Sequence, residues 1–211
     1  MTFLRKPFRY NYNGFVFVLI CINLIAYLFS MFISGANIVF GLNFYGLLAR
    51  KWWWQPLTYM FMHGNASHLL FNMLGLGFFG IMVERAIGSS EFLLFYIVCG
   101  ILSGLLAMVC YFFTGLYGVT LIGASGAIYA TLLLYATIFP TAQVFVFYII
   151  PVPAPLLVVL FSIGALGSQI IGYKVGISHI AHLCGFLVAF LYINIRMGIN
   201  PIRVWREVYR R

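Results

Sequence analysis

Residues 123–130 read GASGAIYA and place Ser125 among small residues at the start of a long apolar run. The whole chain of 211 residues is of this kind: 64% are hydrophobic, 7% are charged, and the mean hydropathy is +1.06. A soluble domain needs more charge to cover its surface, so the composition indicates an integral membrane protein. Runs of about 20 apolar residues predict an all-α bundle of six transmembrane helices, near 14–34, 66–84, 92–113, 125–140, 155–173 and 178–196.

The net charge of +9 lies mainly at the two ends of the chain. Basic residues precede the first predicted span and close or follow the last: Arg5, Lys6, Arg9, Arg196, Arg203, Arg206, Arg210 and Arg211. An even number of spans puts both termini on one side, which the positive-inside rule makes cytoplasmic. Arg85 falls on this side, and Arg50, Lys51 and Lys174 fall opposite. The charge is therefore a topology signal with affinity for lipid headgroups, and it does not indicate nucleic acid binding.

These features divide the chain into three predicted parts. They are a basic cytoplasmic N-terminus over 1–13, a single six-helix transmembrane domain over 14–196 and a basic cytoplasmic tail over 197–211. The first apolar stretch is too long for the core of a signal peptide and lacks a convincing cleavage site, so we interpret it as a span.

Two connections differ from simple turns. The segment 35–64 is polar and irregular, and it contains KWWWQPLTYMFMHG (51–64), whose tryptophans are typical of a membrane–water interface. We expect it to form an interfacial loop between the first two helices that dips into the non-cytoplasmic leaflet and lines a cavity. The segment 139–155 contains Pro151, Pro153 and Pro155, which exclude a continuous helix and predict a cytoplasmic connection.

Ionisable side chains are costly inside a membrane, so each one raises a functional question. The chain has no aspartate, and its three glutamates fall on the cytoplasmic side: Glu84, Glu91 and Glu207. All its histidines fall toward the opposite side, at the depth of Ser125: His63, His68, His179 and His182. With no carboxylate in reach, the inventory excludes a Ser-His-Asp triad but not a Ser-His dyad, in which His182 would take the Ser125 proton.

Helical spacing supports such a site. His68 and Asn72 are four residues apart on one helix face, where both can donate hydrogen bonds to an oxyanion. Tyr129 lies one turn beyond Ser125 on the same face.

Small residues provide a way to bring the dyad together. Gly185 and Ala189 form a small-xxx-small face one turn after His182, and this face can receive Gly126. A hydrogen bond between Ser125 and His182 needs such a close approach of their two helices.

Each residue taken alone has a simpler interpretation. A serine in a Gly/Ala run is usually a packing residue, His68 with Asn72 can be a polar clamp between helices, and Tyr129 can be core. His179, His182 and Cys184 do not share one helix face, so no metal site is expected. All the cysteines fall in apolar spans without paired spacing and are interpreted as buried hydrophobes: Cys21, Cys99, Cys110 and Cys184. The joint occurrence of Ser125, His182, His68 and Asn72 at one depth favours the site.

Four stretches together resemble the rhomboid family of intramembrane serine proteases, in its minimal six-helix form: HGNASHLLFNM (63–73), ERAIG (84–88), GASGAIYA (123–130) and AHLCGFLVA (181–189). The resemblance runs from about residue 40 to 196. It implies that Ser125 is the nucleophile and His182 the general base, and that His68, Asn72 and the Ser125 N–H form the oxyanion hole. Tyr129 would pack under the His182 ring, His63 would shape the cavity, and the small residues Gly123, Gly126 and Gly185 would support the site.

Several further expectations follow from the resemblance. The substrates would be transmembrane segments of other proteins, cut near the non-cytoplasmic face without a cofactor. The expected location is a bacterial inner membrane, with both termini cytoplasmic. Two departures from the family pattern concern packing: Gln55 follows Trp54 where arginine is frequent, and Ala189 stands where a second glycine is usual.

The alternatives to a protease are a binder of membrane helices and a transporter. A catalytically silent binder or chaperone of membrane helices uses the same bundle and makes no demand on Ser125. A transporter is disfavoured, because the chain lacks intramembrane acids and paired broken helices. The sequence leaves the substrate and the oligomeric state open.

Overall fold

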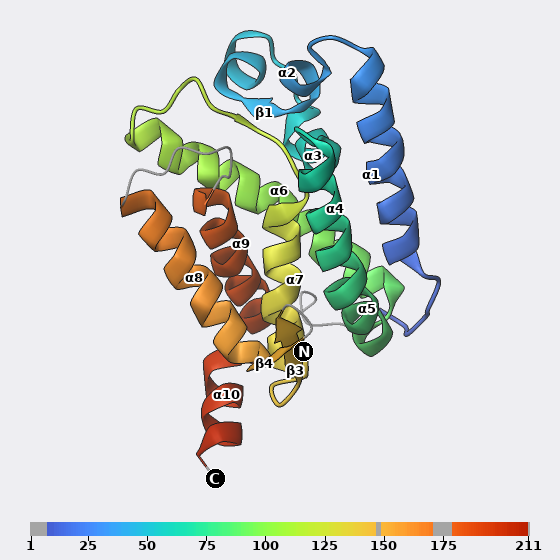
Figure 1. The fold of residues 1–211 in the computed structure, drawn as a ribbon, viewed down its shortest axis with the longest axis vertical. Coiled ribbons are helices and arrows are strands. Elements are labelled where there is room, and N and C mark those ends of the chain that lie inside the picture. The colour runs from blue at the N-terminus through green and yellow to red at the C-terminus, as the bar shows by residue number, and fades with distance from the viewer. Residues whose placement is uncertain (1–7, 147–148, 171–178, 211) are drawn as a thin grey trace.

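The computed structural model describes residues 8–146, 149–170 and 179–210, and most of them are helical (Figure 1). Within these ranges, four helices are long and apolar enough to cross a bilayer: Phe15–Phe32, Ala66–Ile87, Ser89–Phe113 and His179–Met197. Two further apolar helices are shorter, Ser125–Ile138 and Ala154–Gly167. The prediction of a helical membrane protein is confirmed, and each predicted span overlaps a helix. Residues 171–173 and 178 of the predicted spans lie outside the described residues.

The elements follow one another in an order that alternates long helices with short connecting structure. The first helix is α1 (Phe15–Phe32), and the 35–64 loop after it holds α2 (Ala36–Phe40), β1 (Leu42–Asn43), η2 (Tyr45–Ala49), α3 (Gln55–Thr58) and η3 (Tyr59–Phe61). One continuous helix comprises α4 (Ala66–Gly75), the π-helical turn η4 (Leu76–Gly80) and α5 (Ile81–Ile87). Then come α6 (Ser89–Phe113), β2 (Thr120–Leu121), α7 (Ser125–Ile138), β3 (Gln143–Val146), β4 (Ile150–Pro153), α8 (Ala154–Ile170), α9 (His179–Tyr192), η5 (Ile193–Met197) and α10 (Pro201–Tyr209).

The short helix α7 stands inside the bundle, between α4 on one side and α8 and α9 on the other (Figure 1). Its 14 residues span about 21 Å at ~1.5 Å per residue, less than the ~30 Å of a hydrocarbon core. Nearly all of α7 is buried, as expected of a helix that is apolar on every side. The hydroxyls of Thr131 and Thr137 donate to the carbonyls of Ala127 and Leu133, so they leave no buried donor unpaired. Enclosure by other helices is what allows so short a helix at this depth.

The segment 139–155, predicted as a connection without helix, contains a β-hairpin. β3 pairs antiparallel with β4, from Gln143 opposite Pro153 to Val146 opposite Ile150. Pro151 and Pro153 fit there because this two-stranded sheet has two edges, and an edge position needs no donated hydrogen bond. The segment is not one continuous helix, as predicted, but Pro155 lies in the first turn of α8, where a missing N–H is tolerated. The strand pairing was not predicted from the sequence.

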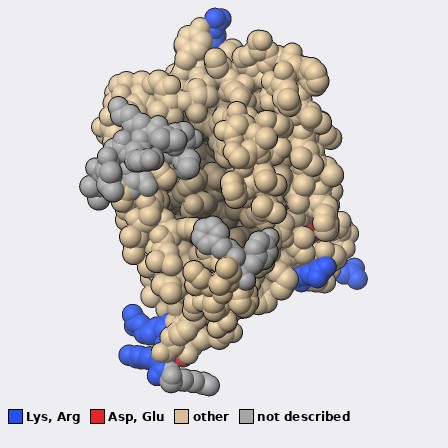
Figure 2. All heavy atoms as spheres, in the orientation of Figure 1, with Lys and Arg blue, Asp and Glu red and all other residues tan. Residues whose placement is uncertain are grey.

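Charged side chains gather at the two ends of the molecule, and the face between them in Figure 2 is largely uncharged. At the lower end, Glu91 pairs with Arg196 at 2.7 Å and accepts a hydrogen bond from Tyr192 at 3.0 Å. The predicted topology signals Arg5, Lys6, Lys174 and Arg211 lie outside the described residues. An uncharged face between charged ends is the kind of surface that a bilayer requires.

Glu84 is fully buried and caps the start of α1. Its carboxylate accepts the backbone N–H groups of Phe15 at 2.6 Å and Val16 at 3.0 Å, and the Ser89 hydroxyl donates to it as well. The first N–H groups of a helix have no partner within the helix and carry partial positive charge, so a buried carboxylate there is stabilised. This contact ties α1 to the turn between α5 and α6.

We expect Glu84→Ala to lower the free energy of unfolding by about 2–3 kcal/mol, because buried donors lose a charged acceptor. The measurement is thermal or denaturant unfolding of the purified protein in detergent. Glu207→Ala is the matched control, since Glu207 is exposed and pairs with Arg203 on α10, and it should leave stability nearly unchanged. Equal losses in the two variants would contradict the capping role.

Candidate active site

Ser125 and His182 are in hydrogen-bonding contact, with His182 Nε2 2.8 Å from Ser125 Oγ. Ser125 is the first residue of α7 and is half-buried, and His182 lies in the first turn of α9 and is 6% exposed. The two helices meet through Gly126 and Gly185. A Cβ added to Gly185 would collide with the Gly126 carbonyl oxygen, so a glycine at 185 allows this approach. The predicted meeting of the hydroxyl and the imidazole is therefore present in the fold.

The His182 ring is held in place from one side by an aromatic ring. Tyr129 stacks on it with ring centroids 4.1 Å apart and planes 12° apart, and Tyr129 itself contacts Phe161 of α8 and Phe186 of α9. His179 meets His182 edge-on at 6.2 Å. The other ring nitrogen, His182 Nδ1, is buried and has no hydrogen-bond partner among the described residues. Among the described residues, no carboxylate therefore orients this histidine; stacking and packing do so instead.

The residues just before Ser125 pack against the start of α4. Gly123 has a φ of +109°, and a Cβ at this position would lie 2.7 Å from His68 Nε2. His68 is thus packed directly against the residues that precede Ser125. Its ring meets the buried His63 ring edge-on at 5.0 Å.

Asn72 and His63 have partly satisfied polar groups. Asn72 Nδ2 donates to the His68 carbonyl at 2.7 Å, which uses one of its two N–H donors, and its Oδ1 is buried without a partner among the described residues. His63 Nδ1 lies 3.2 Å from the Phe61 carbonyl. Burial, and then the neighbouring His68, lower the pKa of His63 to about 4, so its ring is neutral at neutral pH.

Backbone hydrogen bonds connect the 35–64 loop to the residues just before Ser125. β1 pairs antiparallel with β2, with Leu42 opposite Leu121 and Asn43 opposite Thr120. The Gly123 N–H donates to the Tyr59 carbonyl at 2.9 Å, and the Tyr59 hydroxyl donates to the Gly100 carbonyl of α6 at 2.6 Å. Sequence reasoning did not find Tyr59, because its partners lie more than 40 residues away and leave no local pattern.

Gln55 anchors the 35–64 loop from within. Its side chain is fully buried, accepts the Asn43 N–H at 3.3 Å, and donates to the carbonyls of Ile38 at 3.1 Å and Val39 at 3.2 Å. Gln55, which stands where the resemblance predicts arginine, therefore fixes this loop through its own hydrogen bonds. Ala189 is also accommodated, since it is fully buried while the Ser125–His182 contact stays at 2.8 Å.

Comparison with known proteins identifies the family. A model of the rhomboid domain matches residues 50–198, which is more than half of the chain. The chain belongs to the rhomboid family. This rhomboid is 33% identical over 132 residues to the rhomboid protease GluP of Bacillus subtilis, a match that covers 59% of the chain and 25% of that protein. It is 46% identical over 65 residues to the rhomboid protease AarA of Providencia stuartii, covering 30% of the chain and 23% of that protein.

A relative of similar extent is the putative rhomboid protease YdcA of Bacillus subtilis. The identity is 28% over 150 residues, covering 70% of the chain and 71% of that protein. The chain spans about a quarter of the length of GluP and of AarA. All three relatives are named as rhomboid proteases, YdcA as a putative one.

We expect Gly123→Ala to slow labelling of Ser125 by a fluorophosphonate by about tenfold or more. The added methyl group meets the His68 ring, and a positive φ strains any residue with a Cβ. Gly118→Ala is the matched control, because a Cβ there meets nothing within 4 Å. Unchanged labelling of the Gly123 variant would show that the close packing of the loop on His68 does not matter for the site.

We expect Gln55→Ala to destabilise the protein by about 1–3 kcal/mol for each buried group left unpaired, and to slow Ser125 labelling, because Asn43 also pairs with Thr120 near the serine. Thermal unfolding and labelling rates measure the two effects. The exposed Gln143 of β3 gives the control variant Gln143→Ala, which should change neither. If Gln55→Ala behaves like this control, the loop is anchored by other contacts.

Proposed function

We propose that this rhomboid is an intramembrane serine endopeptidase that cleaves transmembrane segments of other membrane proteins. The observation that carries the proposal is the 2.8 Å contact between Ser125 Oγ and His182 Nε2, made in a chain that belongs to a family containing named proteases. A serine hydroxyl is a weak nucleophile until a base takes its proton, and an imidazole at this distance can do so.

The first step is attack of Ser125 Oγ on a backbone carbonyl carbon of the substrate. The proton passes to His182 Nε2, and the carbonyl oxygen becomes an oxyanion. Donors for that oxyanion are near: the Ser125 N–H is free of helix bonding at the start of α7, and His68 and the second N–H of Asn72 lie on the neighbouring helix face. Each such donor is worth about 2.7–4 kcal/mol in the transition state.

The second step breaks the peptide bond. His182 returns the proton to the leaving amine nitrogen, which leaves Ser125 esterified to the substrate's carbonyl carbon. Water then attacks this ester with His182 as base, and the free carboxylic acid and the serine hydroxyl are restored. The imidazole takes a proton twice, first from Ser125 and later from water, and it must be neutral at the start of both transfers. The Tyr129 ring stacks on it, and no glutamate among the described residues is bonded to it.

Access for a substrate helix from the side is supported by the shape of the molecule. Figure 2 shows the face hollowed over α7, between α8 and α4. An intact helix hides its carbonyls in hydrogen bonds, so we propose that the substrate unwinds here and that helix-breaking residues near the cut site favour cleavage.

The arrangement in the membrane is part of the same proposal. Residues 14–196 form one six-helix domain, in which α7 and α8 complete the bundle formed by the four longer helices, and the 35–64 loop lies in the non-cytoplasmic interface. The basic segments 1–13 and 197–211 lie in the cytoplasm, and the membrane is a bacterial inner membrane. The alternative function, a catalytically silent binder of membrane helices, would keep the bundle and lose nothing if Ser125 were changed.

We expect Ser125→Ala to reduce cleavage of a model transmembrane substrate by about 10⁴-fold or more, and His182→Ala to come close to this, because the two act as one unit. The assay uses protein reconstituted in vesicles, with gel analysis of the products and sequencing of the cut site. Unfolding curves of the variants should match the original protein. Cleavage retained by Ser125→Ala protein would rule out the mechanism, and absence of both cleavage and fluorophosphonate labelling in the original protein would favour the silent binder.

A further inference from the structure

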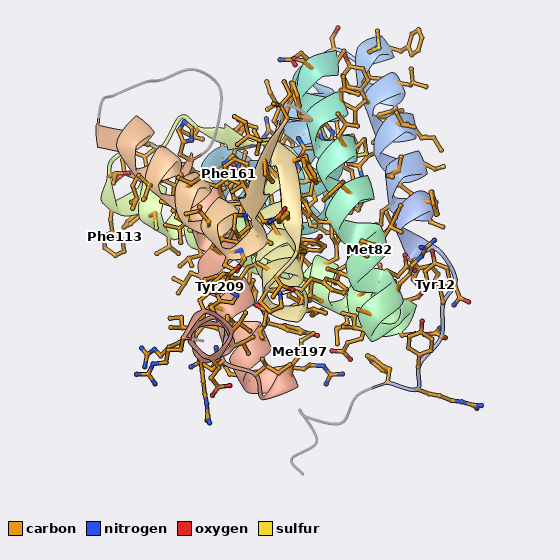
Figure 3. The ribbon with its side chains drawn as sticks, turned by 60° about the horizontal axis from the view of Figure 1, so that its bottom comes forward. Tyr12, Met82, Phe113, Phe161, Met197 and Tyr209 are labelled. Carbon is orange, nitrogen blue, oxygen red and sulfur yellow. The ribbon has the colours of Figure 1, made fainter. Side chains whose placement is uncertain are left out.

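An apolar groove of about 380 Å³ lies on the outside of the bundle, between the 35–64 loop and the end of α6. Phe44, Leu47 and Leu48 line it from the loop, and the α6 residues opposite them include Val109 and Phe113. Leu48 is 67% exposed and Phe113 is 81% exposed, and Figure 3 shows Phe113 pointing away from the bundle. In a membrane protein such side chains face lipid, so the groove opens toward acyl chains.

Two cationic residues come shortly after the groove-lining residue Leu48 in the sequence. Arg50 and Lys51 come two and three residues after Leu48, and both are exposed. The Arg50 guanidinium lies over the Tyr45 ring, 5.3 Å from its centroid, and Arg50 Nε donates to the Tyr45 hydroxyl at 2.6 Å. This contact fixes the direction of the side chain and uses one of its five N–H donors.

None of the glutamates, all of which are among the described residues, pairs with these cations. The whole sequence contains three acidic residues, and each is engaged elsewhere: Glu84 at the start of α1, Glu91 with Arg196, and Glu207 with Arg203. The counter-charge for Arg50 and Lys51 must therefore come from outside the chain.

Aromatic residues indicate where these cations lie relative to a bilayer. Trp52 stacks on Trp54 with ring centroids 6.1 Å apart, the Tyr45 ring meets Trp52 edge-on, and Trp53 is 69% exposed. Tryptophan and tyrosine gather at the level of the lipid headgroups. Arg50 and Lys51 are then at the level of the phosphates, and the apolar groove lies beside them at the level of the chains.

We propose that this groove is a binding site for an anionic glycerophospholipid, with one acyl chain between the loop and α6 and the phosphate held by Arg50 and Lys51. The bound lipid would cover apolar surface on both elements and so fix the loop against α6. Because β1 of the same loop pairs with β2, and Tyr59 holds Gly123, the lipid would also steady the residues that precede Ser125. This second effect rests on the proposed function, whereas binding itself does not.

The test measures lipid retention, which requires no catalysis. Protein purified in detergent is incubated with phosphatidylglycerol or phosphatidylcholine, and native mass spectrometry counts the bound lipids. We expect phosphatidylglycerol to be retained preferentially, and the double variant Arg50→Gln/Lys51→Gln to bind it about tenfold more weakly. The matched control is Arg206→Gln/Arg210→Gln, which removes the same charge from an exposed position of α10 and from the exposed residue that follows it, and should leave retention unchanged.

A third variant tests the groove separately from the charge. Val109→Trp, at an exposed α6 position, fills the groove and should reduce phosphatidylglycerol retention as strongly as the loss of both cations. Equal retention of the two lipids, or equal loss in the α10 control, would overturn the proposal. In vesicles, Ser125 labelling should rise with phosphatidylglycerol in the original protein and not in the Arg50/Lys51 variant. If lipid is retained as expected and no labelling occurs in any vesicle, the binding site stands and the proposed protease function fails.

Discussion

The close contact between the start of α7 and the first turns of α9 is the constraint on which the site depends. At Gly126 and Gly185 the two helices touch through backbone atoms, and any Cβ at Gly185 would separate them. A hydrogen bond between Ser125 and His182 tolerates a change of only a few tenths of an ångström before it weakens. The alanine at 189 shows that the small-residue face need not be glycine throughout, because the closest approach lies one turn earlier, at Gly185.

A second constraint is the irregular chain of the 35–64 loop. Backbone groups that are not in a helix must find partners when they lie at membrane depth. Here Gln55 satisfies three of them, β1 and β2 satisfy others, and the Tyr59 carbonyl accepts from Gly123. Some of the hydrogen bonds that stabilise the loop therefore also connect it to the residues just before Ser125. Stability of the loop and position of the serine are, for this physical reason, not independent.

This rhomboid has few acidic residues, and each of them has a defined partner. With three acidic residues in the sequence, Glu84 and Glu91 hold helices together at one end of the bundle, and Glu207 pairs on the exposed face of α10. None of them is bonded to His182. The imidazole is positioned by Tyr129 and by its helix, which avoids burying a second charge beside it in a medium where an ion is costly. The same scarcity of acidic residues leaves Arg50 and Lys51, near the groove, without an acidic partner among the described residues.

The sequence by itself determined the membrane class, the approximate extent of the long apolar helices and the inventory of chemical groups, but it did not predict the short helices α2, α3 and α10. Those features depend on local composition and on periodicity, as with the apolar run after Ser125 or the four-residue spacing of His68 and Asn72. The tertiary structure alone decided that Ser125 and His182 are 2.8 Å apart, that β1 pairs with β2, that Gln55 is an anchor, and that β3 pairs with β4. Contacts between residues far apart in the chain depend on how whole helices pack, and a single sequence carries no local pattern that records them.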